Sequence, residues 1–327
     1  MDLLQSVSTE EGRVKKLISV YDDAYKSIEA KLESYREKQA RGEITSQFEE
    51  FRLNQLQTEI DSEVKALYSS VESEISTGFS VNYERTYYYQ SYAVERYVNL
   101  EMPGVGGVGY NLNTPVLNTS AVNAAFSEKI AGLTISDRMG QARQALQWKM
   151  REMTSRVIAQ GQTVQSLAKE FQALYDQIEY SKSRGIIAAR TEMLRAYSIG
   201  NDQARIAAEE AGVEFDFLWS AGADKKTRPD HRSMDRKKAK IVDGQPVFTL
   251  PDGSKASSPR VPAHDSEGRQ VGNLAAAESI QCRCRRLDLP FGIAPTERVA
   301  KLENGEYERT RGDMTAEEWY QQNYASK

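Results

Sequence analysis

Two cysteines and two histidines are the residues of this sequence whose types best suit metal chemistry. The cysteines, Cys282 and Cys284, are separated by one residue in the segment QCRC, and the histidines are His231 and His264. Two imidazoles and two thiols can complete the tetrahedral shell of a zinc ion. These four side chains are therefore candidate ligands of one structural zinc ion, which would stabilise a small, loop-rich domain.

The spacing of these four residues leaves a second interpretation open. The arrangement H-x32-H-x17-C-x-C is not a standard zinc pattern, and free cysteine also packs as a small hydrophobic residue. If residues 282–286 form a strand, Cys282 and Cys284 share one face, which permits either joint ligation or ordinary burial. A disulfide between them would close a very small, strained ring, so the pair favours a reducing compartment.

A basic segment surrounds the first histidine. Residues 223–240, ADKKTRPDHRSMDRKKAK, carry eight Lys or Arg and three Asp, in a chain whose net charge is −4. Such a block is usually a solvated loop, but it could also contact phosphates without reading bases. The candidates for phosphate contact are Lys225, Lys226, Arg232, Arg236, Lys237 and Lys238.

Several acidic residues could support a site at His231. Asp230 and Asp235 are close enough in sequence to orient its imidazole. In AARTEMLRA, Arg190 and Glu192 do not face each other on a helix, whereas Glu192 and Arg195 are three residues apart and do. We expect this arginine and glutamate to be structural and to bond to the loops of the sheet.

Known enzyme templates are absent from the sequence, so we assign no catalytic residue. The sequence contains no G-x-S-x-G, H-E-x-x-H or Walker A motif. Residues 103–115, PGVGGVGYNLNTP, contain glycines in G-x-G-x-x-G order but lack the flanking strand and helix, which indicates a loop. The alternative function is a metal-dependent nuclease or hydrolase using His231 with Cys282 and Cys284, and one of the acids above as general base.

Hydrophobic periodicity predicts long helices in the N-terminal third. Two stripes with spacings of three and four cover residues 10–41 and 46–75 and predict a helical hairpin, packed within the subunit or paired with another chain. Residues 82–97 predict a separate helix with an aromatic face. The apolar positions of the two stripes are Val14, Ile18, Tyr21, Tyr25, Ile28, Leu32, Tyr35, Leu53, Leu56, Ile60, Val64, Leu67, Val71 and Ile75.

The period changes from helix to strand after Gly212. Residues 120–212 predict helices with turns near Gly132, Gly161 and Gly185. Alternation over 213–219, a hairpin around the DG at 243–244 and the alternating RCRRLDL predict a short sheet. The expected fold is α+β and helix-rich: a helical arm (1–118), a domain of helices (120–212) and short, mostly antiparallel sheet (213–290) within 119–290, and a tail (291–327).

The tail predicts one short helix, because Thr315 and Glu318 have capping-box spacing and Trp319 could anchor it. Composition adds that 28% of residues are charged and 39% hydrophobic. No apolar run reaches the length of a membrane span, and the N-terminus lacks the order of a signal peptide. We expect a chain that is cytosolic when made.

The combination of motifs resembles the Mu F-like phage head morphogenesis family over about residues 155–290. The matching features follow in order: IAARTE on a helix, a strand ending in Trp219, DKKTRPDHRSMD, a DG turn, PRVPAH and QCRC. The family usually joins P-x-H to C-R-C almost directly, whereas this chain inserts DSEGRQVGNLAAAESI, which makes His231 a stronger partner of the cysteines than His264. The positions that match the family motifs are Arg190, Glu192, Trp219, Asp224, Thr227, Arg228, Asp235 and Arg283, beside the candidate ligands.

The resemblance implies a structural minor head protein of a tailed bacteriophage, present in few copies. Members are associated with the portal vertex and capsid interior and with head assembly, DNA packaging or delivery. The implied partners are the portal protein and other head proteins, with non-specific contact to DNA phosphates and no membrane. The implied location is the virion, after assembly in the host cytoplasm. A DNA-binding regulator is less favoured, because no helix-turn-helix pattern is evident.

Overall fold

The computed structural model describes residues 3–44, 49–101, 116–117, 119–129, 132–159, 164–264, 267, 269–271, 274, 280, 282–302, 304 and 306–325. The chain divides into two compact units, residues 1–78 with 132–190 and residues 79–131 with 191–327. The predicted loop at 103–115 and the turn at Gly161 lie outside the described residues.

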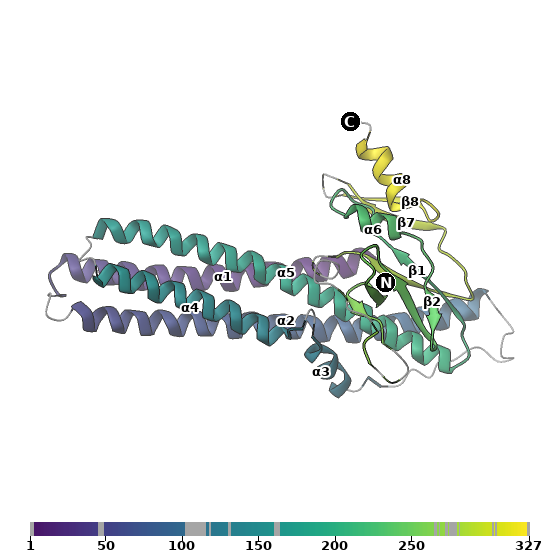
Figure 1. Cartoon of the computed structure of the whole chain (residues 1–327), viewed down its shortest axis with the longest axis horizontal. Coiled ribbons are helices and arrows are strands. Elements are labelled where there is room, and N and C mark those ends of the chain that lie inside the picture. Colours follow the sequence, from purple (N-terminus) through teal and green to yellow (C-terminus); the bar gives the residue numbers. More distant parts are fainter. Residues whose placement is uncertain are drawn as a thin grey trace. The chain divides into compact units, whose positions relative to one another are not determined.

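The first unit is a bundle of four long helical segments that lie side by side (Figure 1). It contains α1 (Leu3–Ala40), the part of α2 (Glu49–Glu101) up to residue 78, α4 (Ile135–Ala159), and the part of α5 (Val164–Glu210) up to residue 190. Ion pairs join α2 to α4 through Asp61 and Arg151 at 2.8 Å, and α1 to α5 through Asp22 and Lys182 at 2.9 Å.

The core of this bundle is formed by the two apolar stripes, which pack within the chain. Ile18 and Tyr25, which the stripe also included, are only partly buried. The predicted hairpin is therefore confirmed as an intramolecular one. The buried positions of the two stripes are Val14, Tyr21, Ile28, Leu32, Tyr35, Leu56, Ile60, Val64, Leu67, Val71 and Ile75, and Leu17, which the stripe did not include, is buried beside them.

Helix α2 is longer than expected, because the separate helix predicted at 82–97 is its continuation. Phe79, Tyr83 and Tyr87 extend the buried stripe at intervals of four residues. Gly78 interrupts it at a cost of only about 1 kcal/mol, which this packing offsets. The aromatic face is confirmed at Tyr83 and Tyr87, whereas Tyr92 is 58% exposed.

The helices of the second unit pack around the end of α2. Phe79, Tyr83, Val122, Ala125 and Ala196 form one buried cluster from α2, α3 (Thr119–Ser127) and α5. Helix α5 ends at Glu210, and Gly212 follows with a φ of 92°, which only glycine adopts easily. The stop predicted at Gly212 is confirmed.

The strands of the second unit form small antiparallel sheets, which confirms the helix-rich α+β fold. The predicted strand at 213–219 and the DG hairpin are both present, and Asp243 and Gly244 have φ values of 50° and 75°, as a tight hairpin turn requires. The sheets are β1 (Phe215–Ser220) with β6 (Arg285–Pro290); β2 (Lys240–Val242), β3 (Gln245–Thr249), β4 (Lys255–Ser258) and β5 (Val261–Pro262) in that order; and β7 (Glu297–Lys301) with β8 (Tyr307–Arg311).

The tail contains more structure than expected. The hairpin β7–β8 was not predicted, because its strands ERVAK and YERTR are rich in charged residues and lack apolar alternation. The short helix is confirmed as α8 (Ala316–Tyr320), with the Thr315 and Glu318 capping box formed, followed by the π-helical turn η1 (Gln321–Ala325). Trp319 is 1% exposed and packs with Ala223 and Ala300.

Within the described ranges, no helix combines the length and the apolar character that crossing a membrane demands.

Candidate metal centre

His231 is held in place by the loop that precedes its helix. The Thr227 hydroxyl donates to the carbonyl of Gly222 at 2.7 Å, and the backbone N–H of Lys226 donates to Asp224 at 2.8 Å. Helix α6 (Pro229–Met234) then begins with proline, whose fixed φ suits a first helical turn. His231, on this helix, is 2% exposed.

The two cysteines lie in an extended segment immediately before β6. Cys282 and Cys284 are 3% and 1% exposed, whereas Arg283 between them is exposed and donates to Asp224 at 2.7 Å. The expected strand at 282–286 begins only at Arg285, because residues 282–284 do not pair with β1. The predicted alternation nevertheless holds, so both thiols enter the same core.

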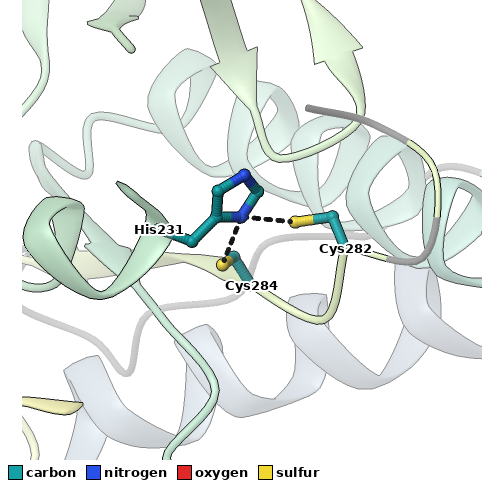
Figure 2. A group of neighbouring side chains, drawn as sticks. All are labelled: His231, Cys282 and Cys284. Carbon is teal, nitrogen blue, oxygen red and sulfur yellow. Dashed lines mark hydrogen bonds between the residues drawn. The ribbon is translucent and has the colours of Figure 1, made fainter. Parts of the chain in front are cut away.

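The imidazole of His231 meets both thiols (Figure 2). Its Nδ1 lies 3.3 Å from Sγ of Cys284 and 3.4 Å from Sγ of Cys282. The three atoms lie within 4.8 Å of one another, and in the described part of the chain no other His, Cys, Asp or Glu joins them. His264 is half-buried and forms an isolated β-bridge with Gln270.

The thiols influence each other's protonation. The hydrogen bond from Cys284, aided by His231 and the charge of Arg260, holds the pKa of Cys282 well below its ordinary value. Burial, together with the hydrogen bond to Cys282, raises the pKa of Cys284. The two pKa values therefore shift in opposite directions, and Cys282 loses its proton more readily than Cys284.

Comparison with known proteins gives a match to the part of the chain that contains His231 and the two cysteines. Residues 148–287 match the family of Phage Mu protein F like proteins. The resemblance predicted from the motifs is thereby confirmed, and its boundaries enclose His231, Cys282 and Cys284.

Two curated relatives align with most of the chain. Minor head protein GP7 of Bacillus phage SPP1 is 23% identical over 318 residues, 95% of this chain and 93% of that protein. The NAD(+)-arginine ADP-ribosyltransferase EFV of Enterococcus faecalis is 25% identical over 305 residues, 93% of this chain. The chain spans only 56% of the length of the transferase. No solved structure gives a significant match.

Several motif positions of the Mu F-like region have structural roles around the centre. Trp219, 1% exposed, packs edge-on against His231, with ring centroids 6.2 Å apart. Arg228 donates to the carbonyl of Ile280 at 2.7 Å and so ties the start of α6 to a residue shortly before the cysteines.

The acids considered as general bases are engaged elsewhere. Asp235 accepts hydrogen bonds from the backbone N–H groups of Ala221 at 2.6 Å and Ala316 at 2.7 Å, and pairs with Arg298 at 2.6 Å. Asp230 is exposed. Asp235 therefore fastens Ala221, directly after β1, to the start of α8. Asp230 lies on the surface, and neither carboxylate joins His231, Cys282 and Cys284.

Glu192 is buried and paired with Arg195 at 2.8 Å, as the three-residue spacing predicted. Arg195 donates to the carbonyl of Ala125 at 2.7 Å, at the end of α3. The helix thus directs Arg195 toward the end of α3. Arg190, also a motif position, is exposed on α5.

Arg260 is the residue of this centre that the sequence did not reveal. It is 1% exposed, and its Nη1 donates to the carbonyl of Cys282 at 2.6 Å. Its Nη2 donates to Ser198 Oγ at 3.1 Å, which joins the cysteine segment to α5. An arginine between two prolines in SPRVP was the available signal, but its partners are distant in sequence.

The basic segment separates into paired arginines and exposed lysines. Arg232 pairs with Glu317 at 2.7 Å and lies 3.8 Å above the ring centroid of Tyr320, and Arg236 donates to the carbonyl of Gly312. Lys238 pairs with Asp216, although its side chain is 69% exposed. The lysines Lys225, Lys226, Lys237 and Lys238 are all exposed.

Proposed function

We propose that this chain is a structural minor head protein of a tailed bacteriophage that joins other head proteins during head assembly. The observation that carries the proposal is the nearly end-to-end alignment with Minor head protein GP7. The match to Phage Mu protein F like proteins supports the same function. We further propose that the protein occupies the portal vertex or the capsid interior of the virion, where it assists DNA packaging or delivery.

The similarity to an ADP-ribosyltransferase is compatible with a structural role. The same chain aligns with 93% of a minor head protein but with only 56% of the transferase. We propose that the shared region is a head-protein module and that the transferase activity belongs to the part of that relative outside the alignment. The His and Cys group supports this view, since no carboxylate in the described part of the chain joins it as a general base.

Exposed aromatic side chains on the helical bundle offer a surface for another head protein. Trp148 of α4 is 66% exposed, and Tyr180 of α5 is 55% exposed. Tryptophan and tyrosine are enriched where proteins meet, because they bury a large area at low entropic cost. We propose that the portal protein, or a neighbouring head protein, covers Trp148.

The test is to locate the protein in assembling particles. Mass spectrometry of purified proheads and virions should detect the chain, and co-expression with the portal protein should yield a complex. Trp148→Ala should weaken that complex, whereas Tyr307→Ala, which removes a partly exposed tyrosine from the second unit, should not. Absence of the chain from both proheads and virions would contradict the proposed function.

A second arm of the experiment separates the structural function from a hydrolytic one. Particles that carry His231→Ala or Cys284→Ser and still assemble should package DNA at the wild-type rate per particle. If those particles assembled normally but failed in a step that cleaves DNA, the nuclease alternative would replace the structural proposal.

A further inference from the structure

We infer that His231, Cys282 and Cys284 bind one zinc ion, which fastens α6 to the segment before β6. This inference stands on the geometry of the three side chains and is independent of the proposed head function. The imidazole and the two thiols are buried together, and the thiols come from residues 51 and 53 positions away from His231 in the chain. An ion bound by all three would link segments that are distant in sequence.

The distances between the three ligand atoms fit a tetrahedral zinc ion. Bond lengths of about 2.3 Å to sulfur and about 2.0 Å to nitrogen place a nitrogen and a sulfur of one tetrahedron about 3.5 Å apart. The two observed separations between Nδ1 of His231 and the sulfurs are 3.3 and 3.4 Å. Figure 2 shows both thiols directed toward this nitrogen, so small shifts would place all three around one ion.

The groups around the three ligands suit bound thiolates. The indole N–H of Trp219 is buried, and the thiol of Cys284 is its hydrogen-bonding neighbour. An N–H group beside a metal-bound sulfur orients that ligand and stabilises its charge. The ring of Trp219 already contacts His231 edge-on. Trp219 is therefore placed to support Cys284 as a thiolate ligand.

The site is structural in character. Cys₂His supplies three of the four tetrahedral positions, a number of protein ligands that catalytic zinc sites also have, so burial and not the ligand count indicates a structural site. A catalytic site would also need solvent access and a general base, but all three ligands are at most 3% exposed and no carboxylate in the described ranges joins them. Ordinary hydrophobic packing of two thiols against an imidazole is the competing explanation.

Metal analysis of the full chain tests the inference. The untagged protein should be purified without a metal-affinity step, incubated with zinc sulfate and desalted. Elemental analysis should then find about one zinc per chain. Cys282→Ser, Cys284→Ser and His231→Ala should lose this zinc, whereas His264→Ala should retain it, because His264 lies outside the group.

Two further measurements use the wild-type chain, so they do not require any variant to fold. Replacement of zinc by Co²⁺ should produce the thiolate charge-transfer band and the visible bands of a tetrahedral ion. A chelator should lower the thermal midpoint, and zinc but not Mg²⁺ should restore it. A folded wild-type chain that binds neither ion, or a folded Cys284→Ser variant that retains wild-type zinc stoichiometry, would overturn the inference.

Discussion

Arg260 donates a hydrogen bond of 2.6 Å from its Nη1 to the backbone carbonyl of Cys282. The same guanidinium reaches Ser198 and the carbonyl of Leu194 on α5 through Nη2. Arg260 thus connects the cysteine segment to the last long helix while placing a positive charge beside the thiols. Because this cation is buried, its polar partners must be retained for it to be stable.

Replacement of Arg260 should destabilise the second unit. Arg260→Ala leaves the carbonyl of Cys282 without this buried donor and should lower the free energy of unfolding by about 3 kcal/mol. Denaturation in urea monitored by tryptophan fluorescence measures the loss. Arg309→Ala is the matched control, because that side chain is 75% exposed and its ion pair should contribute less than about 1 kcal/mol. Equal losses in the two variants would contradict this role.

Two helical glycines should respond to alanine in opposite directions. A Cβ at Gly200 would lie 2.6 Å from the carbonyl oxygen of Tyr83, so Gly200→Ala must displace backbone and should cost about 1–3 kcal/mol. A Cβ at Gly140 would meet no atom within 4 Å, so Gly140→Ala should stabilise its helix by about 0.5–1 kcal/mol. Thermal unfolding of both variants measures whether each is less or more stable than the wild type. A stabilising Gly200→Ala would show that α2 and α5 are not in close contact at this position.

The helical part of the fold was predictable because its information is local. The stripe of α1 and the capping box at Thr315 both depend on neighbours within a few residues. The hairpin β7–β8 was not predictable, since its strands are rich in charged residues and carry no alternation of apolar and polar residues. Helix α2 was divided wrongly because the stripe was followed only to Ile75, whereas its buried positions continue through Phe79 and Tyr83.

The residue types of the candidate site could be predicted from the sequence, but not every residue that forms the site. The alternation of QCRC correctly placed both thiols on one side, and the insertion after His264 correctly favoured His231 as the partner of the cysteines. The loop held by Thr227 and Asp224 decides that His231 joins the thiols. The role of Arg260 depends on contacts with residues 22 and 62 positions away, which sequence spacing does not encode.

Asp202 should make stability depend on acid pH. Burial would raise its pKa, but Arg286 at 2.9 Å and Arg205 at 3.0 Å outweigh burial and hold the pKa below its ordinary value. A depressed carboxyl pKa contributes stability above the unfolded value of about 3.9, and this contribution is lost as the pH falls through the folded value. Asp202→Asn should therefore cost about 2–3 kcal/mol at pH 7 and progressively less below pH of about 4.

Urea denaturation of the wild type and of Asp202→Asn across this pH range measures whether the loss of stability becomes smaller as the pH falls. The contribution of Asp288 to stability should depend on pH in the opposite way, because burial raises the pKa of Asp288 despite its ion pair with Arg286. A raised carboxyl pKa contributes stability that is present below the unfolded value and lost as the pH rises through the folded value. A stability difference for Asp202→Asn that grows toward low pH would refute the assignment.

The exposed lysines of the basic segment should carry any contact with DNA phosphates. Arg232 and Arg236 are less exposed and are bonded within the protein, whereas Lys225, Lys226 and Lys237 are exposed, with Lys225 lying 5.5 Å from the ring centroid of Tyr324. Replacing these three by alanine should weaken binding to duplex DNA of any sequence and reduce the slope of log K against log salt by about one per lysine. The matched control replaces three exposed lysines of the helical bundle, Lys15, Lys26 and Lys65. Fluorescence anisotropy at several salt concentrations measures both slopes. Because net charge changes equally in the two triple variants, an equal loss in both would show that DNA senses only the total charge and not the segment around His231.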